Sequence, residues 1–178
     1  LVGKIENPVR REMEMVAKSV GLNFILNTVL NERGELVKAF AGDMVRAHRE
    51  AVRLAGSIYC PKIPPAADIV LASSHPADSD YWQAIKGAVV SSLSVRDGGA
   101  MVLLTPCEEG ISPTHPEAER YGALQLRDVE ALVKAGVISD LASAAFAMVQ
   151  ARIRAKARLL IVSEGLGQIQ CKALGAEK

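Results

Sequence analysis

Residues 68–86 read DIVLASSHPADSDYWQAIK, and this stretch decides the fold that the sequence predicts. Its apolar run, residues 69–72, is typical of a strand buried on both faces. A polar loop, residues 73–76, follows, and helical spacing of apolar residues resumes after Asp80. This order describes the carboxyl end of a parallel strand, where open α/β sheets hold their ligands. If the chain contains a site, we expect it here.

The remaining patterns predict an α/β fold class. Apolar runs at residues 101–104 and 159–162 also end in polar loops, and predicted helices at 117–120, 126–135 and 140–155 separate them. Residues 22–30 and 36–41 flank a turn at 31–34 and predict an antiparallel hairpin. We therefore expect a mixed sheet with a mainly parallel, three-layer core and the N-terminal antiparallel hairpin on one edge.

The amino-terminal helix carries a regular apolar stripe. Asn7 and Pro8 are typical of a helix start, and Gly21 of its end. The stripe, which we predict to be the buried face, consists of Val9, Met13, Val16, Ala17 and Val20. Asp43 caps a second predicted helix, and His48 falls on its apolar stripe, which predicts a hydrogen-bonded core histidine.

Composition bounds the class of protein. The chain has 178 residues, nearly half of them hydrophobic, and this length predicts one domain over residues 1–178. A net charge of +1 gives no support to a nucleic-acid or anionic-membrane partner. Three scattered cysteines, Cys60, Cys107 and Cys171, are typical of reduced thiols in a cytoplasmic protein. The sequence opens Leu1-Val2-Gly3 without methionine, and we expect it to be a piece of a longer protein.

Familiar catalytic motifs are absent from the sequence. It contains no GxGxxG, GxxxxGK[ST], GxSxG or HExxH. The histidines His48, His75 and His115 lie on separate predicted elements, so we expect no metal site built within this chain alone. His75 lies in the loop after the central strand, where a surface residue and a functional residue are both consistent with the pattern.

Gln83 and Lys86 are the candidate site residues, one helical turn apart. With Asp80 as cap, Gln83 occupies the third helical position and could instead close a capping box. Lys86 has mostly small or apolar neighbours, so its ammonium either extends to solvent or points into a pocket.

Several stretches together resemble the nickel-pincer-nucleotide lactate racemase family, over its C-terminal domain. They are residues 6–13 (ENPVRREM), 24–31 (FILNTVLN), 41–43 (AGD) with 47–50 (AHRE), and 75–78 (HPAD) leading to 82–86 (WQAIK). The resemblance implies the C-terminal α/β domain of a two-domain isomerase that racemises or epimerises a 2-hydroxy acid. It also implies hydride transfer with a nickel-pincer nucleotide held mainly by an N-terminal domain, with no such cofactor bound tightly by this chain alone.

The resemblance also implies roles for single residues. Gln83 and Lys86 map onto the family's glutamine and lysine, which donate to the oxygens of the substrate. Trp82 stands where the family usually has tyrosine, and we place Trp82 and His75 with them as substrate-binding residues. Physically, Lys86 would offset the charge of a carboxylate and Gln83 would orient it.

Departures from the family pattern leave other functions open. The family's nickel-ligating and acid/base histidines have no counterpart here, and Ala145 or Phe146 stands near the position of a further tryptophan. The chain alone is therefore expected to be inactive. The alternatives are a non-catalytic α/β module that binds a small anionic ligand at its loop tips, or an interaction domain if a large apolar patch is exposed.

Overall fold

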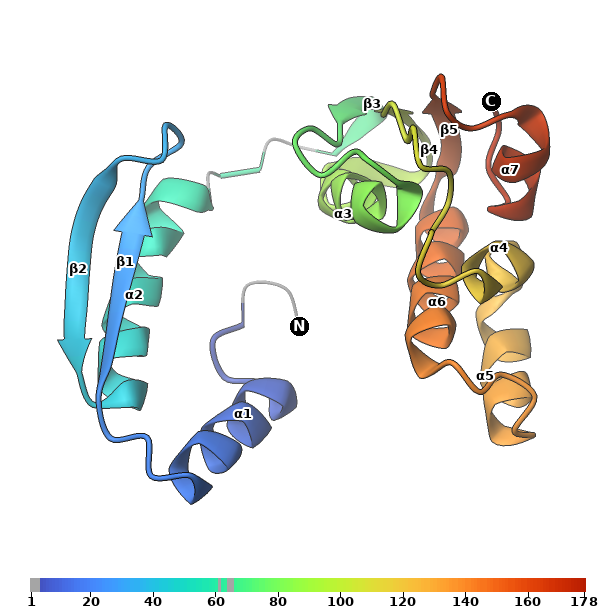
Figure 1. The fold of residues 1–178 in the computed structure, drawn as a ribbon. Coiled ribbons are helices and arrows are strands. Elements are labelled where there is room, and N and C mark those ends of the chain that lie inside the picture. The colour runs from blue at the N-terminus through green and yellow to red at the C-terminus, as the bar shows by residue number, and fades with distance from the viewer. Residues whose placement is uncertain (1–3, 61, 64–65) are drawn as a thin grey trace. The chain divides into compact units, whose positions relative to one another are not determined.

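A computed structural model describes residues 4–60, 62–63 and 66–178, which form two compact units, 1–62 and 63–178. Each unit has its own sheet (Figure 1). That residues 1–178 make one domain stays a prediction.

The first unit pairs a hairpin with two helices. Strands β1 (Ile25–Leu30) and β2 (Leu36–Gly42) are antiparallel, and α2 (Met44–Tyr59) packs on both of them. The cap predicted at Asp43 is present: its carboxylate accepts from the amides of Val45 and Arg46. The hairpin forms a separate two-stranded sheet, so the prediction that it lies on an edge of the parallel sheet is wrong.

Helix α1 (Pro8–Ser19) turns the opposite way from our prediction. Val9, Met13, Val16 and Val20 are exposed, and Val16 keeps 64% of its accessible surface. The side that is covered carries Arg10 and Glu14, because Arg49 of α2 pairs with Glu14 at 2.9 Å and Glu14 also accepts from Arg10 at 2.9 Å. Ion pairs therefore orient this helix, and none of the residues of its apolar stripe is buried, although Ala17 is half-buried.

The second unit contains the parallel sheet. Its order is β3 (Ala67–Ser73), β4 (Val95–Leu104), β5 (Arg158–Val162). The predicted turn at residues 97–99 lies inside β4, where Val95 pairs with Ala67 but Ala100 with Ile69, so the strand bulges there. The parallel sheet of this unit and the hairpin of the first unit confirm the predicted α/β class with a parallel core and an N-terminal antiparallel hairpin.

The second unit has five helices among its described residues, and two of them pack on the sheet. The five are α3 (Tyr81–Ser91), α4 (Glu117–Tyr121), α5 (Leu126–Lys134), α6 (Leu141–Lys156) and α7 (Gln168–Ala173). Both α3 and α6 contact the strands and each other, and the core between includes Met101, Leu103 and Ile161. Ile69 and Leu71 point to the other face and are 67% exposed, so within the described part of this unit two layers are seen rather than three.

Candidate functional site

The loops after the three parallel strands are bonded together at the carboxyl edge of the sheet. The amide of Cys107 donates to the carbonyl of Asp78 at 2.9 Å, which joins the loop after β4 to the loop after β3. On the other side, Ser163 Oγ and the amide of Gly165 donate to the carbonyl of Pro106 at 2.6 and 2.8 Å. The predicted site edge is thus a rigid, hydrogen-bonded platform.

The same platform fixes the start of α3. The amides of Tyr81 and Trp82 donate to the carbonyls of Gly110 and Ile111, both at 2.9 Å. The Asp80 carboxylate accepts from the amide of Gln83 at 2.8 Å and caps the helix, as predicted. The first turn of α3, with Trp82 and Gln83, is therefore held both by the loop after β4 and by its own cap.

Gln83 and Lys86 form a pair on this helix. Lys86 is exposed and Gln83 half-buried, and Lys86 Nζ donates to Gln83 Oε1 at 2.5 Å. The Gln83 side chain is thus engaged with Lys86, not with the helix amino terminus as a capping box requires. No carboxylate pairs with Lys86 among the described residues, so its ammonium is available to an anionic group.

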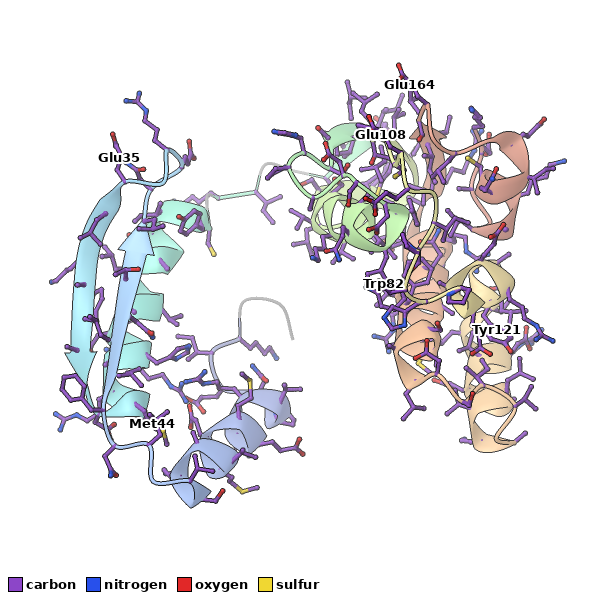
Figure 2. The ribbon with its side chains drawn as sticks, in the orientation of Figure 1. Glu35, Met44, Trp82, Glu108, Tyr121 and Glu164 are labelled. Atoms are coloured by element: carbon purple, nitrogen blue, oxygen red, sulfur yellow. The ribbon has the colours of Figure 1, made fainter. Side chains whose placement is uncertain are left out.

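Trp82 lies on the same face of α3 as Lys86, four residues away. Its indole stacks on the ring of Phe146 of α6, with centroids 5.1 Å apart and planes 7° from parallel. Of the two residues that the sequence left open, Phe146 is therefore the one beside Trp82. Trp82 is labelled in Figure 2. The indole also stacks on His115, a contact that the sequence did not signal.

His75 belongs to the loop after β3 but stands apart from this group. Its side chain is 78% exposed, and its Nδ1 lies 3.1 Å from Asp78 Oδ2. Among the described residues, no hydrogen bond or ion pair joins it to Gln83 or Lys86. Its predicted substrate contact stays a prediction.

Two buried residues that adjoin the platform, Tyr81 and Cys107, carry polar side chains. Tyr81 is fully buried, and its hydroxyl donates to Gln150 Oε1 at 3.1 Å. Burial raises the pKa of Tyr81, so the phenol stays protonated as a donor. Burial also raises the pKa of Cys107, so this thiol at the loop after β4 remains protonated and unreactive.

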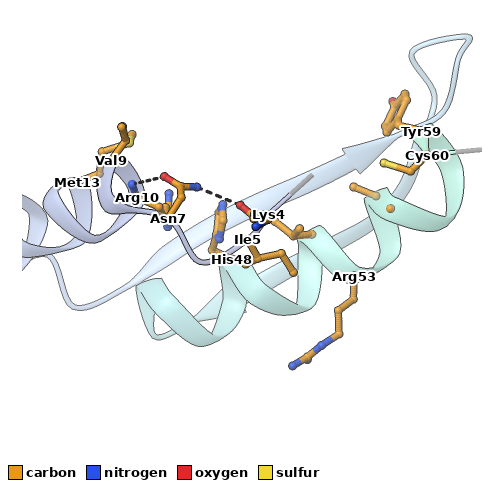
Figure 3. Close-up of a pocket in the computed structure, with 13 residues that line it drawn as sticks. Lys4, Ile5, Asn7, Val9, Arg10, Met13, His48, Arg53, Tyr59 and Cys60 are labelled. Carbon is orange, nitrogen blue, oxygen red and sulfur yellow. Dashed lines mark hydrogen bonds between the residues drawn. The ribbon is translucent and has the colours of Figure 1, made fainter. Parts of the chain in front are cut away.

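A cavity of about 670 Å³ lies elsewhere, in the first unit (Figure 3). It opens between α1 and α2, is mainly apolar, and is lined in part by Val9, Met13, Val52, His48 and Tyr59. His48 is half-buried at its wall, so the prediction of a core position is wrong, but the predicted hydrogen bond is present, from Arg49 to His48 Nδ1 at 3.2 Å. None of Trp82, Gln83, Lys86 or His75 lines this cavity.

A metal site is not formed by the residues that the structure describes. These residues contain no cluster of three or more histidine, cysteine or acidic side chains that could hold a metal ion. The described donor set therefore does not fit a nickel centre, and we assign no step of chemistry to a metal held by this chain. No helix in the described ranges is long and apolar enough to cross a bilayer.

Comparison with known proteins finds two lactate racemases that are similar to this chain. No family model matches the sequence. The lactate racemase of Thermoanaerobacterium thermosaccharolyticum is 34% identical over 106 residues, 58% of this chain and 25% of that protein. The lactate racemase of Lactiplantibacillus plantarum is 29% identical over 113 residues, 60% of this chain and 25% of that protein. The chain thus spans about a quarter of the curated relatives that it matches.

Solved structures agree with these matches. The lactate racemase apoprotein from T. thermosaccharolyticum superimposes with a TM-score of 0.83 at 26% identity, covering 97% of this chain and 42% of that one. A protein from Thermotoga maritima shares the fold, with a TM-score of 0.70 at 17% identity over 98% of this chain and 48% of that one. The predicted resemblance to lactate racemases is confirmed, and the partial coverage fits one domain of such a protein.

Proposed function

We propose that this chain is the C-terminal domain of a lactate-racemase-like isomerase, and that it holds the carboxylate of a 2-hydroxy acid. The premise is its similarity to lactate racemases over more than half its length. The observation that carries the role is the Lys86–Gln83 pair at 2.5 Å on α3, beside the stacked Trp82.

The pair suits a carboxylate for physical reasons. An ammonium gives a charge-assisted hydrogen bond, which is about twice as strong as a neutral one. Gln83 Oε1 accepts from Lys86, which leaves the two amide N–H groups of Gln83 to donate to a second oxygen. Racemisation requires the carbon skeleton to stay still while the configuration at one carbon changes, and a bound carboxylate provides that fixed point.

The remaining machinery is assigned to a further domain. A nickel-pincer nucleotide would supply the hydride acceptor of such an isomerase, and in our proposal an N-terminal domain of the same protein holds it. Lys86 and Gln83 would then bind and orient the substrate, and Trp82 would exclude water beside it. A reducing compartment such as the cytoplasm suits the free thiol of Cys60, which is exposed.

A chimera tests the proposal. The matching segment of the T. thermosaccharolyticum enzyme is replaced by residues 1–178, and racemisation of D- and L-lactate and a panel of other 2-hydroxy acids is measured. We expect activity, and we expect Lys86→Met to lower kcat/KM by roughly tenfold to a hundredfold, because a hydrogen bond to a charged group is lost. Lys134→Met, at an exposed lysine of α5, is the matched control and should leave activity unchanged.

Two results would refute this function. One is a folded, cofactor-loaded chimera that racemises no 2-hydroxy acid; the other is full activity in the Lys86→Met chimera. Carboxylate binding by the chain without racemisation by the chimera would favour the alternative, a non-catalytic module for a small anion.

A further inference from the structure

Trp82 is the only tryptophan of the chain, and two aromatic rings from other elements fix its indole. Phe146 contributes from α6, and His115 from the loop between β4 and α4. The imidazole of His115 lies 4.1 Å from the indole, centroid to centroid, with planes 14° from parallel. A stacked contact of this kind needs its second ring to be held in orientation as well.

Asp140 holds the His115 ring. Nδ1 of His115 lies 2.9 Å from Asp140 Oδ2, and the backbone amide of His115 donates to Ser112 Oγ at 3.1 Å. Asp140 is itself fixed as the cap of α6, since its carboxylate accepts from Ser143 Oγ at 2.6 Å and from the amide of Ala142 at 2.9 Å.

The charge of Asp140 determines which group donates the hydrogen bond between His115 and Asp140. Hydrogen bonds from Ser143 and His115 lower the pKa of Asp140 to about 2, so the carboxylate is ionised near neutral pH. An ionised carboxylate only accepts hydrogen bonds, and Nδ1 of His115 is therefore the donor. The ring plane and the proton-bearing nitrogen are both specified.

We propose that His115, held by Asp140, is a positioning residue that fixes the Trp82 indole beside Gln83 and Lys86. The indole then forms one wall of the carboxylate site, and its position sets how closely a 2-hydroxy acid approaches Lys86. This rests on the proposed function. The effect on the indole itself is independent of that function and can be measured without substrate.

The first experiment uses the near-UV circular dichroism of Trp82 in the 178-residue chain. Four variants are compared: His115→Ala removes ring and hydrogen bond, His115→Phe keeps the ring, Asp140→Asn keeps the helix cap and removes the charge, and His48→Ala is the control in the first unit. We expect the tryptophan signal to fall about twofold or more in His115→Ala and Asp140→Asn, because a mobile chromophore loses its asymmetric surroundings. It should also fall in His115→Phe, because phenylalanine keeps a ring but cannot form the hydrogen bond to Asp140. It should be unchanged in His48→Ala.

If Asp140 only stabilised the fold, Asp140→Asn would change the far-UV spectrum and the thermal midpoint. We expect both to be preserved, because asparagine is an equally good helix cap. In the chimera, His115→Ala should lower kcat by roughly tenfold to a hundredfold, because the Trp82 indole no longer has a fixed position beside the substrate. KM should stay within about threefold of its value in the parent chimera. His115→Phe should also lower kcat, because its ring is not held by Asp140.

An unchanged tryptophan signal in both His115→Ala and Asp140→Asn would overturn the positioning role, whatever the chimera does. If the two variants lose the tryptophan signal but the parent chimera is inactive, the positioning of Trp82 is supported and the racemase function is refuted. The two failures are therefore distinguishable.

Discussion

Gly165 lies so close to Cys107 that a Cβ atom on residue 165 would overlap with the Cys107 carbonyl oxygen. This approach lets the loop after β5 bond to the loop after β4, where the amide of Gly165 donates to the carbonyl of Pro106 at 2.8 Å. Only a residue without a side chain allows two backbones to come this near. The close approach therefore holds two of the three strand tips of the platform together.

Gly165→Ala should therefore separate the two loops. We expect it to lower the free energy of unfolding by roughly 1–3 kcal/mol, the usual cost of overpacking, measured by urea denaturation. Gly56→Ala is the control, because a Cβ there meets nothing within 4 Å and the residue lies inside α2. That variant should be neutral or stabilising by up to about 1 kcal/mol. Equal stability of the two variants would show that the loops do not meet as described.

Removal of the Tyr81 hydroxyl should also destabilise the second unit. Tyr81→Phe leaves Gln150 Oε1 buried without its donor, and an unpaired buried group costs about 1–3 kcal/mol. Tyr121→Phe is the matched control, because Tyr121 is also buried and its hydroxyl makes no hydrogen bond among the described residues. Thermal unfolding of both variants measures the difference. A Tyr121→Phe loss as large as that of Tyr81→Phe would contradict the role given to the Gln150 contact.

Local signals in the sequence were sufficient for most elements of the second unit. Asp80 was predicted as a cap because its side chain bonds an amide only three residues away. Apolar runs predicted the positions of β3, β4 and β5, because a strand needs only one short continuous run. The predicted burial of residues 69–72 on both faces is wrong, since Ile69 and Leu71 of β3 are 67% exposed. The short helix α7 had no such signal, and the glycines of β4 were indistinguishable from a turn because both need positive φ at Gly98.

Contacts between distant residues were not accessible from the sequence. The orientation of α1 depends on Arg49, 35 residues after Glu14 and on another helix, so the apolar stripe alone indicated the wrong face. At the site, the positions of Gln83 and Lys86 followed from helical spacing. The stack of Trp82 on His115 joins two elements that no periodicity relates, and only the fold brings them together.

The Glu14 ion pairs predict a pH dependence of stability. Partial burial acts to raise the pKa of Glu14, but hydrogen bonds and charges of Arg10 and Arg49 lower it below the ordinary value of 4.5. A carboxyl whose folded pKa is depressed contributes stability above its unfolded pKa, and that stability is lost as pH falls through the folded value. The thermal midpoint of the wild-type first unit should therefore fall below pH 4.5 more steeply than that of Glu14→Gln.

The control for this measurement is Glu12→Gln, at an exposed glutamate of the same helix with no ion pair among the described residues. Its stability profile should follow that of the wild type. Parallel profiles for Glu14→Gln and the wild type would mean that the pairs with Arg10 and Arg49 contribute nothing to folding.

The exposure of Lys86 predicts that ligand affinity depends on salt. A charge at the surface is screened by ions within about 10 Å at 0.1 M ionic strength, so attraction of a carboxylate to Lys86 should weaken as salt is added. We expect lactate to change the fluorescence of Trp82, which lies on the same helix face, with an apparent Kd that rises several-fold between low and moderate salt. Lys86→Met should bind lactate more weakly and with little salt dependence, whereas Lys134→Met should behave as the wild type. A salt dependence that persists in Lys86→Met would assign the carboxylate to another cation and remove Lys86 from the site.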